Sequence, residues 1–83
     1  MGATDTRRAV LRLRERAQLR ALPPPERRGE IRRAAGVTTE ELASALGVTA
    51  SAVIMWERGS RMPSLRHRQR YGEALRVLGG DDA

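Results

Sequence analysis

Several residue types are missing from this sequence or rare in it, and each absence excludes a class of site. The 83 residues include no cysteine and a single histidine. Without cysteine there is no disulfide framework and no thiolate metal site, and one histidine leaves too few ligands for structural zinc. We therefore expect a protein with no metal and no cofactor.

Long apolar runs are also missing. No run approaches the length of a transmembrane helix, and the N-terminus lacks the apolar core of a signal peptide. We expect a cytoplasmic protein that does not enter a membrane. A chain of 83 residues buries only a modest core, which favours one all-helical domain or dependence on a partner.

The residues that catalysis needs are scarce. The candidate nucleophiles are Ser and Thr, and the sole histidine, His67, lies in an Arg-rich stretch where we expect it to be solvated. No glycine-rich phosphate-binding loop is present. We therefore expect that the protein is not an enzyme.

Lysine is absent as well, so that all 16 basic residues are Arg, and the net charge is +6. Residues 1–36 hold 10 Arg against 4 acidic residues, and residues 58–76 hold 6 against 1. Residues 37–57, between these blocks, contain no basic residue and 3 acidic ones. Exclusive use of Arg is typical of a GC-rich genome, but the surplus of positive charge indicates a polyanionic partner.

Residues 1–22 form the first predicted unit, a basic amphipathic helix. Arg occupies most of its surface, and a narrow apolar stripe recurs at helical spacing, formed by Val10, Leu13, Ala17 and Ala21. The Leu-Pro-Pro-Pro sequence at 22–25 ends this helix, because proline has no amide hydrogen and disfavours helix in the preceding residue.

This N-terminal helix cannot be stable alone in water with so narrow an apolar stripe. We expect it to dock on the rest of the chain, with Leu19 and Leu22 beside Tyr71 and Leu75, which would leave the Arg face free for phosphate. Pairing with a second copy of the same helix is the alternative.

Residues 23–78 form the second predicted unit, followed by an acidic tail at 79–83. Four helices are expected here, at about 25–35, 39–46, 49–58 and 64–78, and no strand. Glycines at 36, 47 and 59 suit the ends of the first three, and Thr38 with Glu41 has the form of a capping box. The fold class is therefore all-α, a compact domain of five helices.

The helices at 39–46 and 49–58, joined by a short turn at Gly47, have the form of a helix-turn-helix. The second of them is about 12 Å long, which is about the width of the DNA major groove. The residues expected to close the angle between the two helices are Leu42, Ala43, Leu46, Val48, Val53 and Trp56.

The stretch IRRAAGVTTEELASALGVTASAVIMWERGSRMPSL, residues 31–65, resembles the helix-turn-helix domain of the phage Cro and C1 repressors, the XRE-type family. The resemblance implies a lambda-repressor-like fold, a double-stranded DNA partner, and a recognition helix at about 49–58 that lies in the major groove. It also implies a buried ion pair between Arg32 and Glu57. The preceding LPPPERRGEIRRAAG resembles small regulators of phages and mobile elements.

The residues predicted to read bases are mostly apolar: Ala50, Ser51, Ile54 and Met55. Ala50 and Met55 can pack on thymine methyl groups and Ser51 can hydrogen-bond to base edges, but no residue before Arg58 can make the bidentate contact to guanine. Phosphate contacts should therefore supply most of the affinity. They are assigned to Thr39, where the family usually carries Gln, and to Thr49, Arg58, Ser60 and Arg61.

The sequence thus predicts a sequence-specific DNA-binding regulator of transcription, of phage or mobile-element type. It does not distinguish a repressor from an activator. The protein would act as a homodimer on an inverted repeat or within a nucleoprotein complex. One alternative is a protein-interaction module, such as an antitoxin or a polymerase-contacting factor, that uses the apolar face of Ile54 and Met55. Another is a recombination directionality factor.

Overall fold

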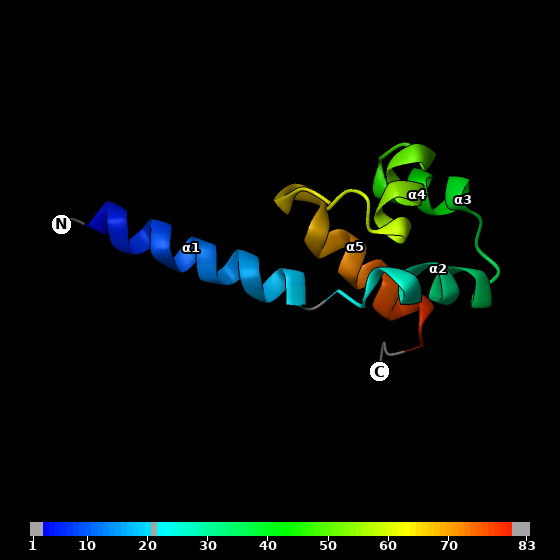
Figure 1. The fold of residues 1–83 in the computed structure, drawn as a ribbon, viewed down its shortest axis with the longest axis horizontal. Helices are drawn as coiled ribbons and strands as arrows, with labels where there is room; N and C mark the ends of the chain where they lie inside the picture. The colour runs from blue at the N-terminus through cyan, green and yellow to red at the C-terminus, as the bar shows by residue number, and fades with distance from the viewer. Residues whose placement is uncertain (1–2, 21, 81–83) are drawn as a thin grey trace.

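A computed structural model of the chain describes residues 3–20 and 22–80, apart from the side chains of residues 3–4, 15 and 18–20. Within these residues the secondary structure is entirely α-helical, and no strand is present. The elements are α1 (Ala3–Arg20), α2 (Pro25–Ala34), α3 (Thr39–Leu46), α4 (Ala50–Arg58) and α5 (Leu65–Leu78) (Figure 1). The predicted all-α, five-helix fold is confirmed, and the four ranges predicted after residue 23 agree to within one residue.

Local hydrogen bonds fix where α3 and α4 begin. The Thr38 hydroxyl accepts a hydrogen bond from the Glu41 amide at 3.0 Å, and the Glu41 carboxylate accepts one from the Thr38 amide at 2.8 Å. These bonds lower the pKa of Glu41. The Thr49 hydroxyl caps α4 by accepting from the Ala52 amide at 3.1 Å. The turn between the helices is made by Gly47, whose φ of 71° is left-handed. The capping box and this turn were both predicted.

The core lies where α2, α3 and α4 meet α5. Its buried apolar residues are Leu22, Leu42, Ala43, Leu46, Val53, Trp56, Tyr71 and Leu75. The rings of Trp56 and Tyr71 lie 4.9 Å apart between centroids. Burial raises the pKa of Tyr71 to about 12, and its hydroxyl has no hydrogen-bond partner among the described residues. Ile31 of α2 packs against this cluster, so that one set of apolar side chains joins the last four helices.

His67 is not solvated as we predicted. Its ring lies 6.0 Å from that of Trp56, and its Nδ1 atom is buried without a hydrogen-bond partner among the described residues. The prediction followed from the Arg residues beside it in the sequence, but α5 turns this side chain toward the core. His67 is therefore a packing residue at the start of α5.

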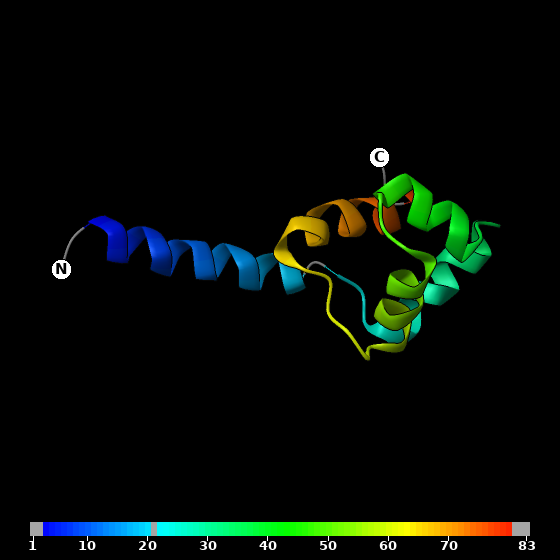
Figure 2. The ribbon, with the colours of Figure 1, turned by 90° about the horizontal axis from the view of Figure 1, so that it is seen from above.

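Helix α1 does not dock along the domain, which corrects the sequence-based expectation. It projects away from the other helices in both views (Figures 1 and 2), and the longest dimension of the molecule is 50 Å. Val10 and Leu13 are 55% and 58% exposed, and Ala17 is exposed too. The C-terminal end of α1 approaches α5.

One part of the predicted docking is present. Leu22 is buried in the core with Tyr71 and Leu75. The side chains of Leu19 and Ala21 lie outside the described residues. Leu22 packs with α5 at this end of the core, while Leu65 and Val77 of α5 stay 48% and 51% exposed. The proline segment then leads the chain from Leu22 into α2.

Candidate nucleic-acid interface

Helix α4 presents one face to the core and another to solvent. Val53 and Trp56 are 0% and 3% exposed, as their spacing predicted. Of the four residues predicted to read bases, Ser51 is exposed, and Ile54 and Met55 are half-buried. Ala50 is also half-buried and packs partly against the core. The accessible face of α4 is therefore small, with one hydroxyl and two partly accessible apolar side chains.

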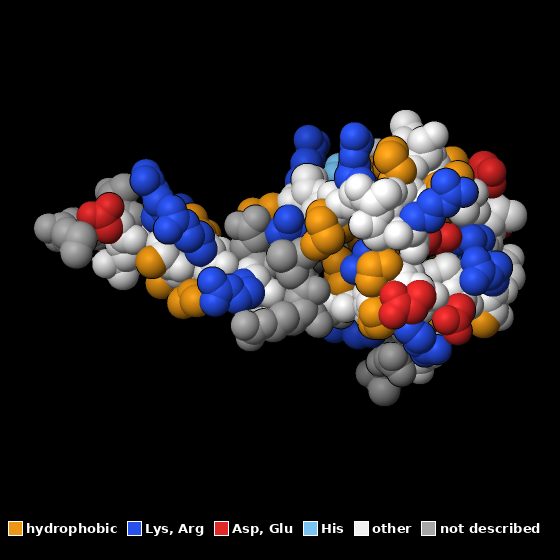
Figure 3. Space-filling view, viewed as in Figure 1, with side chains coloured by type: hydrophobic (Ala, Val, Ile, Leu, Met, Phe, Trp, Pro, Cys, Tyr) orange, Lys and Arg blue, Asp and Glu red, His pale blue; other side chains and the backbone are white. Residues whose placement is uncertain are grey.

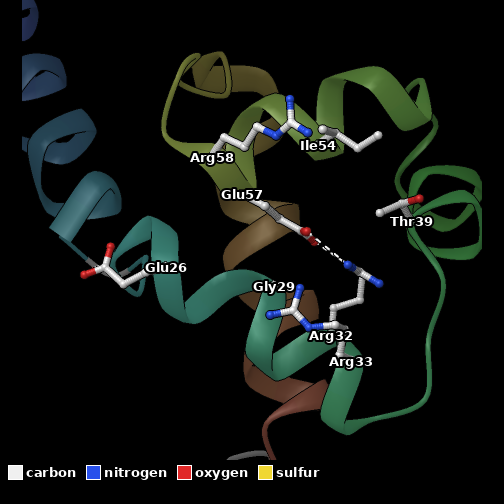
Figure 4. Close-up of a pocket in the computed structure, with 8 residues that line it drawn as sticks. All are labelled: Glu26, Gly29, Arg32, Arg33, Thr39, Ile54, Glu57 and Arg58. Carbon is white, nitrogen blue, oxygen red and sulfur yellow. Dashed lines mark hydrogen bonds and ion pairs between the residues drawn. The ribbon is translucent and has the colours of Figure 1, made fainter.

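An ion pair between Arg32 and Glu57 joins α2 to α4 (Figure 4). Arg32 Nε donates to Glu57 Oε2 at 2.6 Å, and its NH2 group donates to Oε1 at 3.1 Å. The remaining NH1 group donates to the Val37 carbonyl at 2.9 Å. Both charged side chains are 11% exposed, and the bond to Glu57 raises the pKa of Arg32. The predicted pair is present, and it turns both residues away from solvent.

A cleft of about 340 Å³ opens between α2, the start of α3 and α4. Thr39 lies on one side of it and Arg58 on the other, with Ile54 between them (Figure 4). Arg33 also lines the cleft. The carboxylates of Glu26 and Glu57 line the cleft too, and the Thr39 hydroxyl donates to Glu40 Oε2 at 3.2 Å. The guanidinium groups of Arg33 and Arg58 are the groups in this cleft that suit an anion such as a phosphate.

Arg33 is a candidate that the sequence did not single out. Its guanidinium lies over Gly29, such that a Cβ atom at Gly29 would sit 2.9 Å from Arg33 NH1 and 3.1 Å from Glu57 Oε1. The absent side chain leaves room for both charged groups. The signal in the sequence was a glycine inside a helix, whose use becomes apparent only when α4 is in place.

The loop after α4 carries the other residues predicted to contact phosphate. Arg58, Ser60 and Arg61 are all exposed. The Ser60 hydroxyl donates to the Met55 carbonyl at 3.3 Å, which shapes the loop against the last turn of α4. Thr49, at the opposite end of α4, is exposed, and its hydroxyl already accepts the capping bond, so that only its proton is free to donate. The predicted phosphate contacts thus lie at both ends of α4.

Arg28 is a second residue whose role the sequence did not reveal. It is 4% exposed, and its Nε donates to the Pro23 carbonyl at 2.8 Å while its NH1 donates to the Trp56 carbonyl at 3.0 Å. Beside it, a Cβ atom at Gly59 would lie 3.1 Å from Pro25 Cγ. The proline segment is therefore held against the C-terminal end of α4.

Residues 29–77, which span α3, its turn and α4, match the model of a helix-turn-helix family. The chain belongs to this family. It is the XRE-type family of the Cro and C1 repressors that the sequence resembled. The helix-turn-helix family is one of DNA-binding regulatory domains and not of enzymes. The comparisons with curated proteins and with solved structures gave no match.

The helix-turn-helix match leaves α1 outside it, since the match begins within α2. Within the described residues, no group of three or more His, Asp or Glu side chains is placed to hold a metal ion. The helices described here are all too short or too polar to cross a membrane.

Proposed function

We propose that the protein is a sequence-specific double-stranded DNA-binding regulator of transcription whose α4 lies in the major groove. The observation that carries this proposal is the arrangement of α4. The core holds its inner face through Val53 and Trp56, Ser51 and Met55 lie on the outer side, and exposed Arg residues follow directly at its C-terminal end. A short helix placed in this way can enter the groove while the loop after it meets the backbone.

Phosphate contacts should supply more of the binding affinity than base contacts. Ser51 can bond to base edges, and Met55 and Ala50 can contact thymine methyl groups. Before Arg58, α4 carries no guanidinium group that could make the bidentate contact to guanine. Base contacts should therefore each contribute little, and DNA shape should contribute to specificity. The groups proposed to hold the backbone are Thr39, Thr49, Arg58, Ser60, Arg61 and, from the cleft, Arg33.

The proposal extends to the biological setting. The resemblance of residues 22–36 to small regulators supports a phage or mobile-element type. Helix-turn-helix proteins commonly bind as dimers to half-sites one helical turn apart, which supports a homodimer on an inverted repeat. A recombination directionality factor would use the same DNA contacts.

A protein partner is the second candidate function, and one observation favours it. Besides the half-buried Ile54 and Met55 on α4, the segment that follows exposes Met62 and Leu65 by 50% and 48%. Exposed apolar residues in number mark protein interfaces more often than DNA interfaces. An antitoxin or a polymerase-contacting factor would use this surface.

Selection of bound duplexes from a random pool, followed by affinity measurements on the selected and a random duplex, tests the proposed function. Met55→Ala or Ser51→Ala should reduce the affinity difference between the two duplexes by about 1–3 kcal/mol, because each variant removes a side-chain group that touches the bases. Arg58→Ala or Arg61→Ala should weaken binding to both duplexes alike, because phosphate contacts carry no sequence information.

Matched controls are available for the two base-reading variants. Ser44 is exposed on α3, and Met62 lies in the loop after α4, so Ser44→Ala and Met62→Ala should leave discrimination unchanged. Enrichment of no sequence, together with the same weak affinity for every duplex, would overturn sequence-specific recognition. Equal losses of discrimination in Met55→Ala and Met62→Ala would overturn the assignment of the groove face.

A further inference from the structure

Helix α1 is a strongly basic surface that the helix-turn-helix match leaves unexplained. All of its described side chains are exposed, and five of them are Arg: Arg7, Arg8, Arg12, Arg14 and Arg16. None of these five is in an ion pair or hydrogen bond with another described residue. Asp5 is the one acidic side chain described on this helix. In Figure 3 blue side chains lie along α1, with hydrophobic side chains beside them.

The order of these residues along α1 is unfavourable for a helix in water. Arg8, Arg12 and Arg16 follow one another at four-residue spacing, so they lie in one row along the helix. Like charges at this spacing destabilise a helix, and the exposed Val10 and Leu13 gain nothing from packing. A row of negative charges would reverse the sign of this interaction.

The segment from Leu22 to Pro25, which follows α1, is held beside the proposed DNA-binding face. Leu22 is buried in the core, and Arg28 bonds the Pro23 carbonyl and the carbonyl of Trp56, in the last turn of α4. Pro25 lies against Gly59, the residue that ends α4. The segment that joins α1 to the domain therefore lies next to the loop of Arg58 to Arg61.

We propose that α1 is a second DNA-backbone contact, in which Arg8, Arg12 and Arg16 bind phosphates that flank the base pairs read by α4. This inference rests on the proposed function. The 18 residues of α1 span about 27 Å, and the Arg row spans about 12 Å. One DNA strand presents a phosphate about every 3.4 Å along the axis, so the row can reach about three phosphates.

Charge decides between duplex DNA and a second copy of the chain as the occupant. The apolar stripe of α1 is narrow, and Arg14 and Arg16 lie beside it on either side. Two α1 helices packed through this stripe would bring their Arg side chains together, whereas a duplex supplies the opposite charge along the whole helix.

The salt dependence of binding to a mixed-sequence duplex of about 30 base pairs tests this inference in the full chain, because the release of counterions reports how many phosphates the protein neutralises. For Arg8→Gln with Arg12→Gln, the slope of log affinity against log salt should fall by about 1.8, which is about 0.9 for each phosphate that the variant no longer neutralises. The matched control is Arg27→Gln with Arg76→Gln. It removes the same charge from exposed positions on α2 and α5, and Arg27 lines a separate pocket with Leu78. Its slope should stay at the wild-type value.

Circular dichroism of both double variants should show at least the wild-type helix content, because Gln at positions 8 and 12 removes like-charge repulsion. A wild-type protein that binds no duplex even at low salt would overturn the proposed function. Duplex binding with the same slope in the wild type and in Arg8→Gln with Arg12→Gln would overturn the α1 contact alone. The same holds if that slope is unchanged and Leu13→Asp converts a dimer into a monomer, because α1 would then be a dimerisation helix.

Discussion

The ion pair of Arg32 with Glu57 offers a sharp test of how this small domain is held together. Glu57→Gln keeps the size of the side chain but removes its charge. Arg32 would then remain buried between α2 and α4 with a neutral partner and with its bond to the Val37 carbonyl. Breaking a buried ion pair from one side costs about 3–5 kcal/mol of unfolding free energy. Because Gln keeps an amide oxygen that can accept a hydrogen bond, we expect a loss of about 3 kcal/mol.

Such a loss is large for a chain of this length. A stability of about 0.05–0.15 kcal/mol per residue gives about 4–12 kcal/mol for 83 residues. A loss of about 3 kcal/mol should lower the melting temperature by at least about 12 °C. Urea denaturation followed by circular dichroism measures the free energy of unfolding directly, and the slope of that free energy against urea should not change.

The chain contains its own control for this experiment. Arg27 and Glu30 also form an ion pair, but at 3.6 Å and with side chains 58% and 55% exposed. Glu30→Gln should cost less than about 1 kcal/mol, because solvent screens an exposed pair. Replacing both buried partners, as Arg32→Met with Glu57→Leu, should cost less than Glu57→Gln alone. Equal losses for Glu57→Gln and Glu30→Gln would refute the reasoning.

Two further predictions concern the core and the end of α4. Tyr71→Phe should raise the free energy of unfolding at neutral pH by about 1 kcal/mol, because it removes a buried hydroxyl without a partner among the described residues. Burial raises the pKa of Tyr71 to about 12 in the folded state, above its ordinary value of about 10. The contribution of Tyr71 to the free energy of unfolding of the wild type should therefore be constant below about pH 10 and fall as the pH rises toward 12. Urea denaturation across this range should show no tyrosine-linked fall in Tyr71→Phe. Gly59→Ala should cost more than Gly47→Ala in the same assay. Both glycines have a left-handed φ, 74° and 71°, but a Cβ at Gly59 would also lie 3.1 Å from Pro25 Cγ, whereas one at Gly47 would meet nothing within 4 Å. Equal losses of unfolding free energy in the two variants would mean that Pro25 moves aside from the new Cβ atom without a measurable penalty.

The parts of the fold that were predictable from the sequence are those fixed by local chemistry. The capping box of Thr38 and Glu41 lies within four residues, and the left-handed turn needs only Gly47. The apolar spacing of Val53 and Trp56 gave the buried face of α4, because a helix repeats its faces whatever covers them. The family resemblance then supplied the ion pair, which periodicity alone would not have found.

The parts that were missed depend on which segments meet across the fold. Arg28 reads as one more surface charge until the Trp56 carbonyl, 28 residues away, is brought to it. His67 was assigned from its charged neighbours, but the direction of its ring is set by Trp56. The stripe of α1 was correctly identified as apolar, yet the sequence could not show that α1 projects from the domain with Val10 and Leu13 exposed.

The position of Leu22 and Arg28 bears on where the cooperative folding unit begins. The family match starts at residue 29. A domain cut there would lose the core side chain of Leu22 and the guanidinium of Arg28, which donates to two backbone carbonyls. The unit that unfolds as a whole should therefore start at Leu22, seven residues before the shared family region. The proline segment then belongs to the globule and does not act as a flexible spacer between Leu22 and α2.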